Sequence, residues 1–222
     1  MELRHYLAVD LGATSGRTMV ATFDGNNVTL RELTRFANPM IPIAGYIHWN
    51  IAELYNQILA ALKLARKEGI ELASIGIDTW GCDVVYFGKK GNLISLPYCY
   101  RGSHTEGAME AYFERMAAQE LYKRSGIQFM PFNTVFQLDA VNRLGLVDLA
   151  QVDKILFIPD ALNYMLTGVH ACDYSDASGM LLLDVRNKCW SKQMLEICSV
   201  SDEMMPKLFE SVRFLTTAVA SE

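Results

Sequence analysis

Residues 8–17 read AVDLGATSGR, and this stretch decides the fold. It closes an apolar run, so it predicts a strand ending in Asp10, a turn of small and hydroxylated residues, and a second strand over residues 18–23. Glycines let the backbone approach phosphate oxygens, and neighbouring amide groups and hydroxyls can donate to an anion. We therefore expect nucleotide phosphates at this turn, with Asp10 holding a hydrated Mg²⁺. The residues expected to contact the phosphates are Ala13, Thr14, Ser15, Gly16 and Arg17.

The same stretch excludes two common phosphate loops. It lacks the closing Gly-Lys-Ser/Thr of a P-loop, and a strand follows the turn where a dinucleotide fingerprint needs a helix. An ordinary hairpin turn of the same composition stays open as an alternative. Arg17 has two readings as well, since it could contribute charge to the phosphate site or pair with an acid in the sheet.

The pattern outward from this stretch predicts a mixed α/β domain. A helix starting after Asn50, a good N-cap, carries apolar residues at helical spacing and can end at Gly69. A buried strand then ends in Asp78, so Asp10 and Asp78 are expected at the ends of neighbouring strands. A loop is expected over residues 38–49, and the expected strands are residues 6–10, 17–24, 28–36, 73–79, 84–87 and 93–100.

The remainder of the chain predicts a mostly helical extension. Asn133 is the expected N-cap of a helix with one apolar stripe, and Gly168 is expected to end another. The other expected helices are residues 105–116, 119–124, 159–166, 191–197 and 201–209.

Composition narrows the class of partner. The chain has 222 residues and a net charge of −5, which argues against binding nucleic acid or an anionic membrane surface. No apolar run approaches the ~20 residues that span a bilayer. Five cysteines without a CxxC pair favour reduced thiols in the cytoplasm, and the four histidines have no metal-ligand spacing.

Three further segments carry a resemblance to a known family. They are residues 74–85 (SIGIDTWGCDVV), 96–101 (LPYCYR) and 125–138 (SGIQFMPFNTVFQL). Together with residues 8–17 they resemble the amino-terminal lobe of the FGGY family of carbohydrate kinases, an actin-like, ribonuclease H-like fold. The likeness is greatest to members that act on L-rhamnulose, and it runs to about Trp190.

The resemblance implies an activity and a sugar site. The activity is transfer of phosphate from ATP, with Mg²⁺, to L-rhamnulose, giving L-rhamnulose 1-phosphate and ADP in a cleft between two lobes. Gly81 matches a sugar-contacting position. The neighbouring positions expected to line the sugar pocket are Cys82, Asp83, Tyr100 and Phe132. A plainer interpretation keeps Asp83 as a turn cap and Cys82 as a small buried residue.

The resemblance also implies what lies outside these residues. The family base belongs to a Ser-His-Asp-Thr-Ala-like segment expected downstream of Glu222, so we expect no catalytic residue within residues 1–222. These residues are expected to form one amino-terminal lobe that has little turnover alone and self-associates through the face that a second lobe would cover. Residues 211–222 do not resemble the family's next segment.

Alternatives of other kinds remain at this point. One is another FGGY kinase, such as a xylulokinase-like enzyme acting on a related ketose or polyol. A second is a non-catalytic module that binds sugar or nucleotide. A third is a ribonuclease H-like nuclease, because Asp10 and Asp78 imitate two metal carboxylates, although the acidic charge and the hydroxyl-rich turn speak against it.

Overall fold

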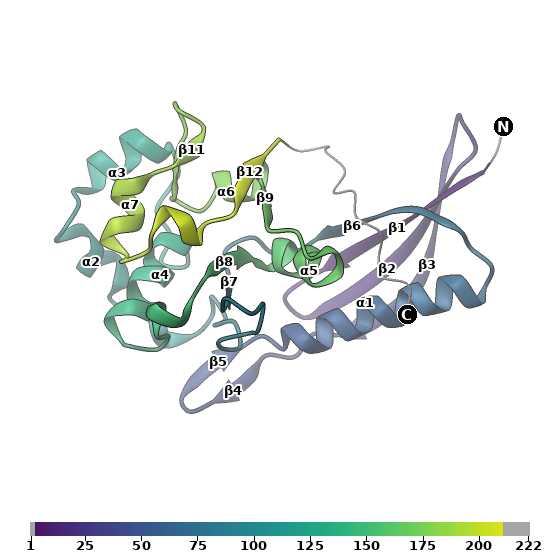
Figure 1. Ribbon diagram of the computed structural model, residues 1–222, viewed down its shortest axis with the longest axis horizontal. Coiled ribbons are helices and arrows are strands. Elements are labelled where there is room, and N and C mark those ends of the chain that lie inside the picture. The colour runs from purple at the N-terminus through teal and green to yellow at the C-terminus, as the bar shows by residue number, and fades with distance from the viewer. Residues whose placement is uncertain (1–2, 211–222) are drawn as a thin grey trace. The chain divides into compact units, whose positions relative to one another are not determined.

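The computed structural model describes residues 3–210, which form two compact units (Figure 1). Among the described residues, unit 1 comprises residues 3–41 and 49–80, and unit 2 comprises residues 42–48 and 81–210. None of the described helices is long and apolar enough to cross a membrane. The five cysteines are free thiols.

Unit 1 is a mixed four-stranded sheet in the order β3-β2-β1-β6 with one long helix. The three consecutive strands pair antiparallel, and β6 pairs parallel with β1. Alternate residues of β1 are buried and α1 buries one stripe, so the helix covers the apolar face of the sheet. The elements are β1 (Arg4–Leu11), β2 (Ser15–Phe23), β3 (Val28–Ala37), α1 (Ile51–Lys67) and β6 (Leu72–Asp78).

The ends of α1 follow the sequence signals. Asn50 accepts a hydrogen bond from the backbone N–H of Glu53 at 3.2 Å, as an N-cap does. Gly69 follows the helix with a φ of 73°, a conformation that favours glycine. The expected cap and stop of this helix are therefore confirmed.

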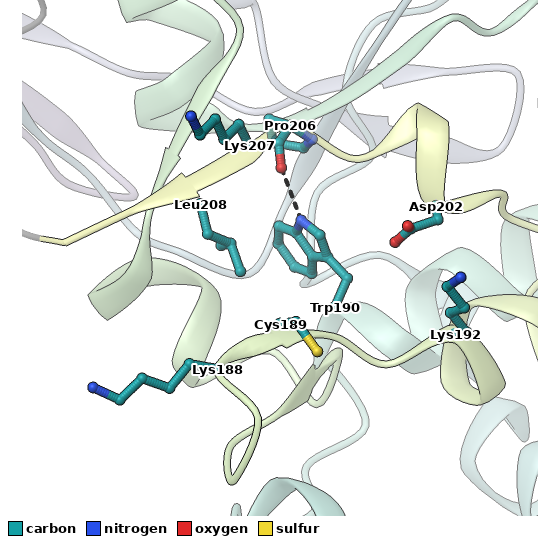
Figure 2. A pocket seen from close by; sticks show the side chains of 8 residues that line it. All are labelled: Lys188, Cys189, Trp190, Lys192, Asp202, Pro206, Lys207 and Leu208. Atoms are coloured by element: carbon teal, nitrogen blue, oxygen red, sulfur yellow. Dashed lines mark hydrogen bonds between the residues drawn. The ribbon is translucent and has the colours of Figure 1, made fainter.

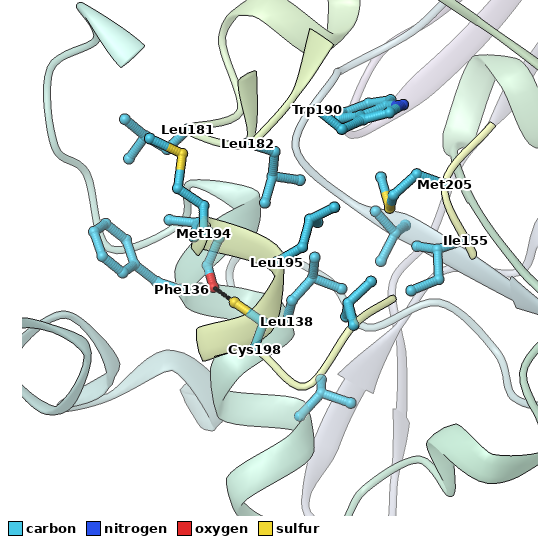
Figure 3. Packing of buried hydrophobic residues seen from close by; sticks show 14 of the residues in the cluster. Phe136, Leu138, Ile155, Leu181, Leu182, Trp190, Met194, Leu195, Cys198 and Met205 are labelled. Carbon is cyan, nitrogen blue, oxygen red and sulfur yellow. Dashed lines mark hydrogen bonds between the residues drawn. The ribbon is translucent and has the colours of Figure 1, made fainter. Parts of the chain in front are cut away.

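Unit 2 packs short helices and two-residue to four-residue strands around one apolar core. Phe136 and Leu138 of α4 meet Leu195 and Cys198 there, and Cys198 donates to the Val135 carbonyl at 3.3 Å (Figure 3). The helices are α2 (Ala108–Phe113), α3 (Ala118–Ser125), α4 (Thr134–Arg143), α5 (Ile158–Thr167), α6 (Tyr174–Ser178) and α7 (Lys192–Ile197), with 3₁₀ turns at Ser103–Thr105, Leu149–Gln151 and Asp202–Met204. The strands are β4 (Ile41–Ile43), β5 (Tyr46–His48), β7 (Val84–Phe87), β8 (Lys154–Phe157), β9 (Ala171–Asp173), β10 (Leu183–Asp184), β11 (Cys189–Trp190) and β12 (Lys207–Phe209).

Several predicted elements of unit 2 are wrong. Residues 93–100 form no strand, since Leu93 bridges to β7 and Tyr98 to β5, and Pro97 between them has no N–H to donate. Residues 201–209 form a 3₁₀ turn and then β12, because Pro206 holds Met205 in an extended conformation. The expected loop at residues 38–49 contains the β4–β5 pair.

Asn133 precedes α4 as predicted but does not cap it with its side chain. Its side-chain oxygen accepts from the Met130 N–H at 2.6 Å, and its amide donates to the Gly179 carbonyl at 3.2 Å. The side chain therefore joins two loops instead of satisfying the helix end.

Candidate functional site

The turn between β1 and β2 is held from one side by a buried amide. Gly12 N–H donates to the Ser15 carbonyl at 2.9 Å across the turn. Asn38 then binds the turn twice, through its N–H to the Thr14 carbonyl at 2.9 Å and through its side-chain amide to the Gly12 carbonyl at 3.0 Å. Asn38 is 3% exposed, so this clamp is part of the packed interior of unit 1.

The outer side of the turn presents donors. Within residues 3–210, the amide groups of Ala13 and Thr14 have no hydrogen-bond acceptor, and the side chains of Thr14 and Ser15 are exposed. An anion could accept from both the amides and the hydroxyls. Three of the five expected phosphate residues, Ala13, Thr14 and Ser15, thus present donors on this side of the turn.

Packing against neighbouring side chains explains the glycine at position 16, which was expected to contact phosphate. A Cβ on Gly16 would lie 2.4 Å from the ring of Phe36 and 2.8 Å from the side chain of Leu11. The residue is buried, so it is the packing of Phe36 and Leu11 that requires glycine here. Its expected contact with phosphate could come only through its backbone.

Asp10 and Arg17 form an ion pair across the β1–β2 hairpin. They are directly opposite in the register, and both Nε and a terminal nitrogen of Arg17 lie 2.8 Å from Asp10 Oδ2. On the other side, Asp10 is opposite Asp78 in the parallel pair with β6. The expected juxtaposition of Asp10 and Asp78 is confirmed, and Arg17 pairs with Asp10, the acid in the sheet.

This donor set fits a hydrated Mg²⁺ better than a fully protein-bound ion. Among the described residues, no group of three or more His, Cys, Asp or Glu side chains is placed to hold a metal. Mg²⁺ keeps several waters and uses one or two carboxylates together with substrate phosphates. Asp10 and Asp78, half-buried and exposed respectively, can supply those carboxylates.

Four of the five expected sugar-site residues of unit 2 come together around Gln137 of α4. Gln137 Nε2 lies 2.9 Å from each of three acceptors, namely the Cys82 carbonyl, Asp83 Oδ1 and the Phe132 carbonyl. Asp83 Oδ2 accepts from the backbone N–H of Tyr100 at 3.2 Å. Residues distant in sequence are therefore connected by side-chain hydrogen bonds.

Asp83 belongs to this framework, by which we mean the hydrogen bonds that join Gln137 to Cys82, Asp83 and Phe132, and its side chain is not exposed to a ligand. Its exposed fraction is 0%, and both of its oxygens accept hydrogen bonds from the protein. A buried carboxylate needs such partners. Asp83 is therefore placed to hold Tyr100 and Gln137 in position, and direct contact between its buried carboxylate and a ligand is not supported.

Cys82 belongs to the same framework. Its carbonyl accepts from Thr134 Oγ1 at 2.8 Å as well as from Gln137. Burial first, and the charge of Asp83 second, raise the pKa of the Cys82 thiol. The thiol is therefore protonated at neutral pH, in line with the interpretation of Cys82 as a small buried residue.

Gly81 lies against a carboxylate from α6. A Cβ on Gly81 would be 2.2 Å from Asp176 Oδ1 and 2.7 Å from Met180 Cε. The space beyond its Cα is thus filled by the protein's own side chains. A contact between Gly81 and a sugar would therefore have to come through its backbone atoms and stays a prediction.

Aromatic side chains border these segments. The rings of Tyr100 and Phe132 meet edge-on with centroids 5.8 Å apart, and Arg101 Nε donates to the Tyr100 hydroxyl at 2.9 Å. In unit 1, Trp80 packs against the fully buried Trp49 with centroids 4.3 Å apart. Trp80 is thus accounted for by packing, whereas Tyr100 and Phe132 are half-buried and available to a ligand.

Three residues of these sites were missed from the sequence. Asn38 and Gln137 act through buried amides, and the only signal for Gln137 was a polar residue within an apolar helix stripe. Asp176 reaches Gly81 from a short helix almost a hundred positions later, which no local pattern predicts.

A cavity of about 300 Å³ lies elsewhere in unit 2, near the end of the described chain (Figure 2). Trp190 forms one wall, with its indole N–H donating to the Pro206 carbonyl at 2.8 Å. None of the predicted site residues lines it. The lining residues are Lys188, Cys189, Trp190, Lys192, Asp202, Pro206, Lys207 and Leu208.

Comparison with known proteins identifies the family to which the chain belongs. The N-terminal domain of the FGGY family of carbohydrate kinases matches residues 5–221. The chain therefore belongs to the FGGY family of carbohydrate kinases, as the motifs predicted. The match continues past Trp190, where the resemblance read from the motifs ended, into residues 211–222, which are outside the described residues.

Its relatives include rhamnulokinases. The rhamnulokinase of Bacteroides thetaiotaomicron is 44% identical over 200 residues, which are 90% of this chain and 41% of that protein. The rhamnulokinase of Pectobacterium atrosepticum is 38% identical over 213 residues, which are 93% of this chain and 43% of that protein. The chain thus spans about two-fifths of the length of these relatives.

Solved structures agree on the fold. A gluconate kinase from Lactobacillus acidophilus superposes with a TM-score of 0.85 at 17% identity, covering 97% of this chain and 44% of that one. A xylulose kinase from the same organism gives 0.80 at 18% identity, covering 93% and 42%. These likenesses confirm the predicted actin-like fold.

Proposed function

We propose that this chain is the sugar-binding part, and a phosphate-binding part, of an ATP-dependent kinase that converts L-rhamnulose to L-rhamnulose 1-phosphate. The observation that carries the proposal is the joining of Cys82, Asp83, Tyr100 and Phe132 by hydrogen bonds and a ring contact. The substrate is proposed from the rhamnulokinase relatives, at 38–44% identity over most of the chain.

On the nucleotide side, each proposed role follows from the chemistry of the residue. The amides of Ala13 and Thr14, with the hydroxyls of Thr14 and Ser15, donate to phosphate oxygens of ATP. Asp10 holds a hydrated Mg²⁺ and Arg17 balances the local charge. When bound, the ion neutralises phosphate charge, which is the main requirement of phosphoryl transfer.

On the sugar side, we assign contact to backbone and aromatic groups. Gly81 and Cys82 present main-chain polar atoms to sugar hydroxyls, and Tyr100 and Phe132 offer apolar ring surface to a sugar face. Asp83 holds this arrangement from beneath. The hydroxyl of the ketose attacks the γ-phosphorus, ADP leaves, and the hydroxyl proton goes to a base that the family resemblance assigns downstream of Glu222.

A substrate panel on a kinase of the relatives' full length tests the proposal. Release of ADP is measured with L-rhamnulose, D-xylulose, D-gluconate and glycerol, and the product is identified by ³¹P NMR. L-rhamnulose should give the largest kcat/KM. A larger value with D-xylulose would favour the xylulokinase-like alternative, and sugar binding without ADP release would favour the non-catalytic module.

Self-association of the isolated chain is the remaining part of the proposal. The expected surface is the face that a second lobe would cover. The edge strand β3 is a further candidate, because its Val28 and Leu30 are 60% and 65% exposed and an unpaired apolar edge is prone to pairing. Light scattering over a range of concentrations should show a mass above that of the monomer. A monomer at every concentration would contradict this part alone.

A further inference from the structure

A single buried amide fixes the segments that form the proposed sugar side. Gln137 is 3% exposed and lies in the middle of α4. Its Nε2 is within 2.9 Å of the Cys82 carbonyl, Asp83 Oδ1 and the Phe132 carbonyl. These three acceptors belong to the residues just before β7 and to the loop before α4.

The orientation of this amide is determined by its surroundings. Because the three neighbours can only accept, the NH₂ group must face them and the oxygen must face the other way. That oxygen lies 3.3 Å from His104 Nε2, so His104 carries its proton on Nε2 and donates to Gln137. Burial lowers the pKa of His104, which agrees with a neutral ring.

The Gln137 amide also influences the position of Tyr100, which it reaches only through Asp83. Asp83, held by Gln137 through Oδ1, uses Oδ2 to accept from the backbone N–H of Tyr100. The Phe132 carbonyl is fixed by the same nitrogen, and the Phe132 and Tyr100 rings meet at 5.8 Å. Gln137 thus links the two rings to the Cys82 backbone, whose carbonyl is also held by Thr134 Oγ1 at 2.8 Å.

We propose that Gln137 is the positioning residue for the sugar and that its two N–H donors set sugar affinity. The inference rests on the proposed function, since it names the residue that supports that same site. A purely structural role would lower the yield of folded protein and leave both KM values unchanged. A positioning role raises the KM for the sugar and leaves the KM for ATP as it was.

The variant Gln137→Glu removes the two N–H donors of the side chain and keeps its length. Glutamate has the same length and shape, but it presents an oxygen to two carbonyls and a carboxylate where the wild type presents N–H groups. In the full-length kinase we expect the KM for L-rhamnulose to rise about 10-fold or more, because donors to buried acceptors are lost. The KM for ATP should stay within about twofold of the wild type.

Gln119→Glu is the matched control. It makes the same chemical change on α3, where Gln119 is exposed, and both KM values should equal those of the wild type. If Gln137→Glu is recovered unfolded, Gln137→Met, which keeps the length without a charge, is measured by the same criterion.

The outcomes separate this inference from the proposed function. A wild-type enzyme that does not phosphorylate L-rhamnulose contradicts the proposed function. An active wild type in which the folded Gln137 variant has an unchanged sugar KM, or in which both KM values rise equally, overturns the role of Gln137.

Discussion

Alanine at position 81 measures how closely α6 packs on the proposed sugar segment. The new methyl carbon would lie 2.2 Å from Asp176 Oδ1, about 1.2 Å inside the 3.4 Å at which ordinary contact begins. The atoms in the way are the ends of side chains, so Asp176 and Met180 must move. Overpacking of this kind costs about 1–3 kcal/mol. For a chain of this size that corresponds to a fall in Tm of roughly 2–12 °C.

The assay is calorimetry on the chain with Gly81→Ala, Asp176→Ala and the double variant. If the two side chains collide, Asp176→Ala should relieve much of the loss, with a coupling energy on the order of 1 kcal/mol. Gly179→Ala is the control, since a Cβ at Gly179 meets nothing within 4 Å. A Tm for Gly81→Ala equal to that of the control, or strictly additive effects in the double variant, would refute the packing account.

Three further predictions concern other parts of the chain. Gly16→Ala should destabilise unit 1 by about 1–3 kcal/mol in thermal unfolding, and Phe36→Leu should recover part of the loss; an unchanged Tm would contradict the tight packing. Asp10→Asn should cut kcat in the full-length kinase with little change in Tm, because its ion pair is exposed and worth at most about 1 kcal/mol; normal kcat would remove Asp10 from the metal site. Burial raises the pKa of Asp160 from 3.8 to about 7, so the folded state binds this proton more tightly and stability falls as pH rises through that window. Relative to the wild type, Asp160→Asn should therefore gain a few kcal/mol, in order of magnitude, in free energy of unfolding between pH 4 and pH 8, measured by urea unfolding at each pH. If the difference in free energy of unfolding between variant and wild type is the same at every pH, the raised pKa of Asp160 is contradicted.

Local signals predicted unit 1 well. Apolar runs separated by turn residues predicted β1, β2 and β3, and Asn50 and Gly69 mark the ends of α1. Even the pairing of Asp10 with Asp78 followed from strand order. Each of these features is decided within one element or between elements adjacent in the sheet.

Unit 2 depends more on contacts distant in sequence. Residues 93–100 look like a strand, but their hydrogen bonds go to two different strands and Pro97 interrupts them. Residues 201–209 form a 3₁₀ turn and a strand instead of the expected helix, and Pro206, a signal against a helix, was already present in the sequence.

For the candidate site, too, local motifs predicted the segments, whereas the orientation of the side chains depends on contacts distant in sequence. Motifs predicted the segments at residues 81–83 and 132, but which side chains face a ligand depends on burial. Asp83 turned inward because Gln137 and the Tyr100 amide surround its carboxylate. Asp176 reaches Gly81 only in the folded unit.

A crystal structure of the full-length kinase with L-rhamnulose bound tests the central claim most directly. The account predicts sugar oxygens within hydrogen-bond distance of the backbone at Gly81 or Cys82, with a sugar face against Phe132 or Tyr100 and Asp83 still bonded to Gln137. A sugar bound away from all of these residues would contradict the account.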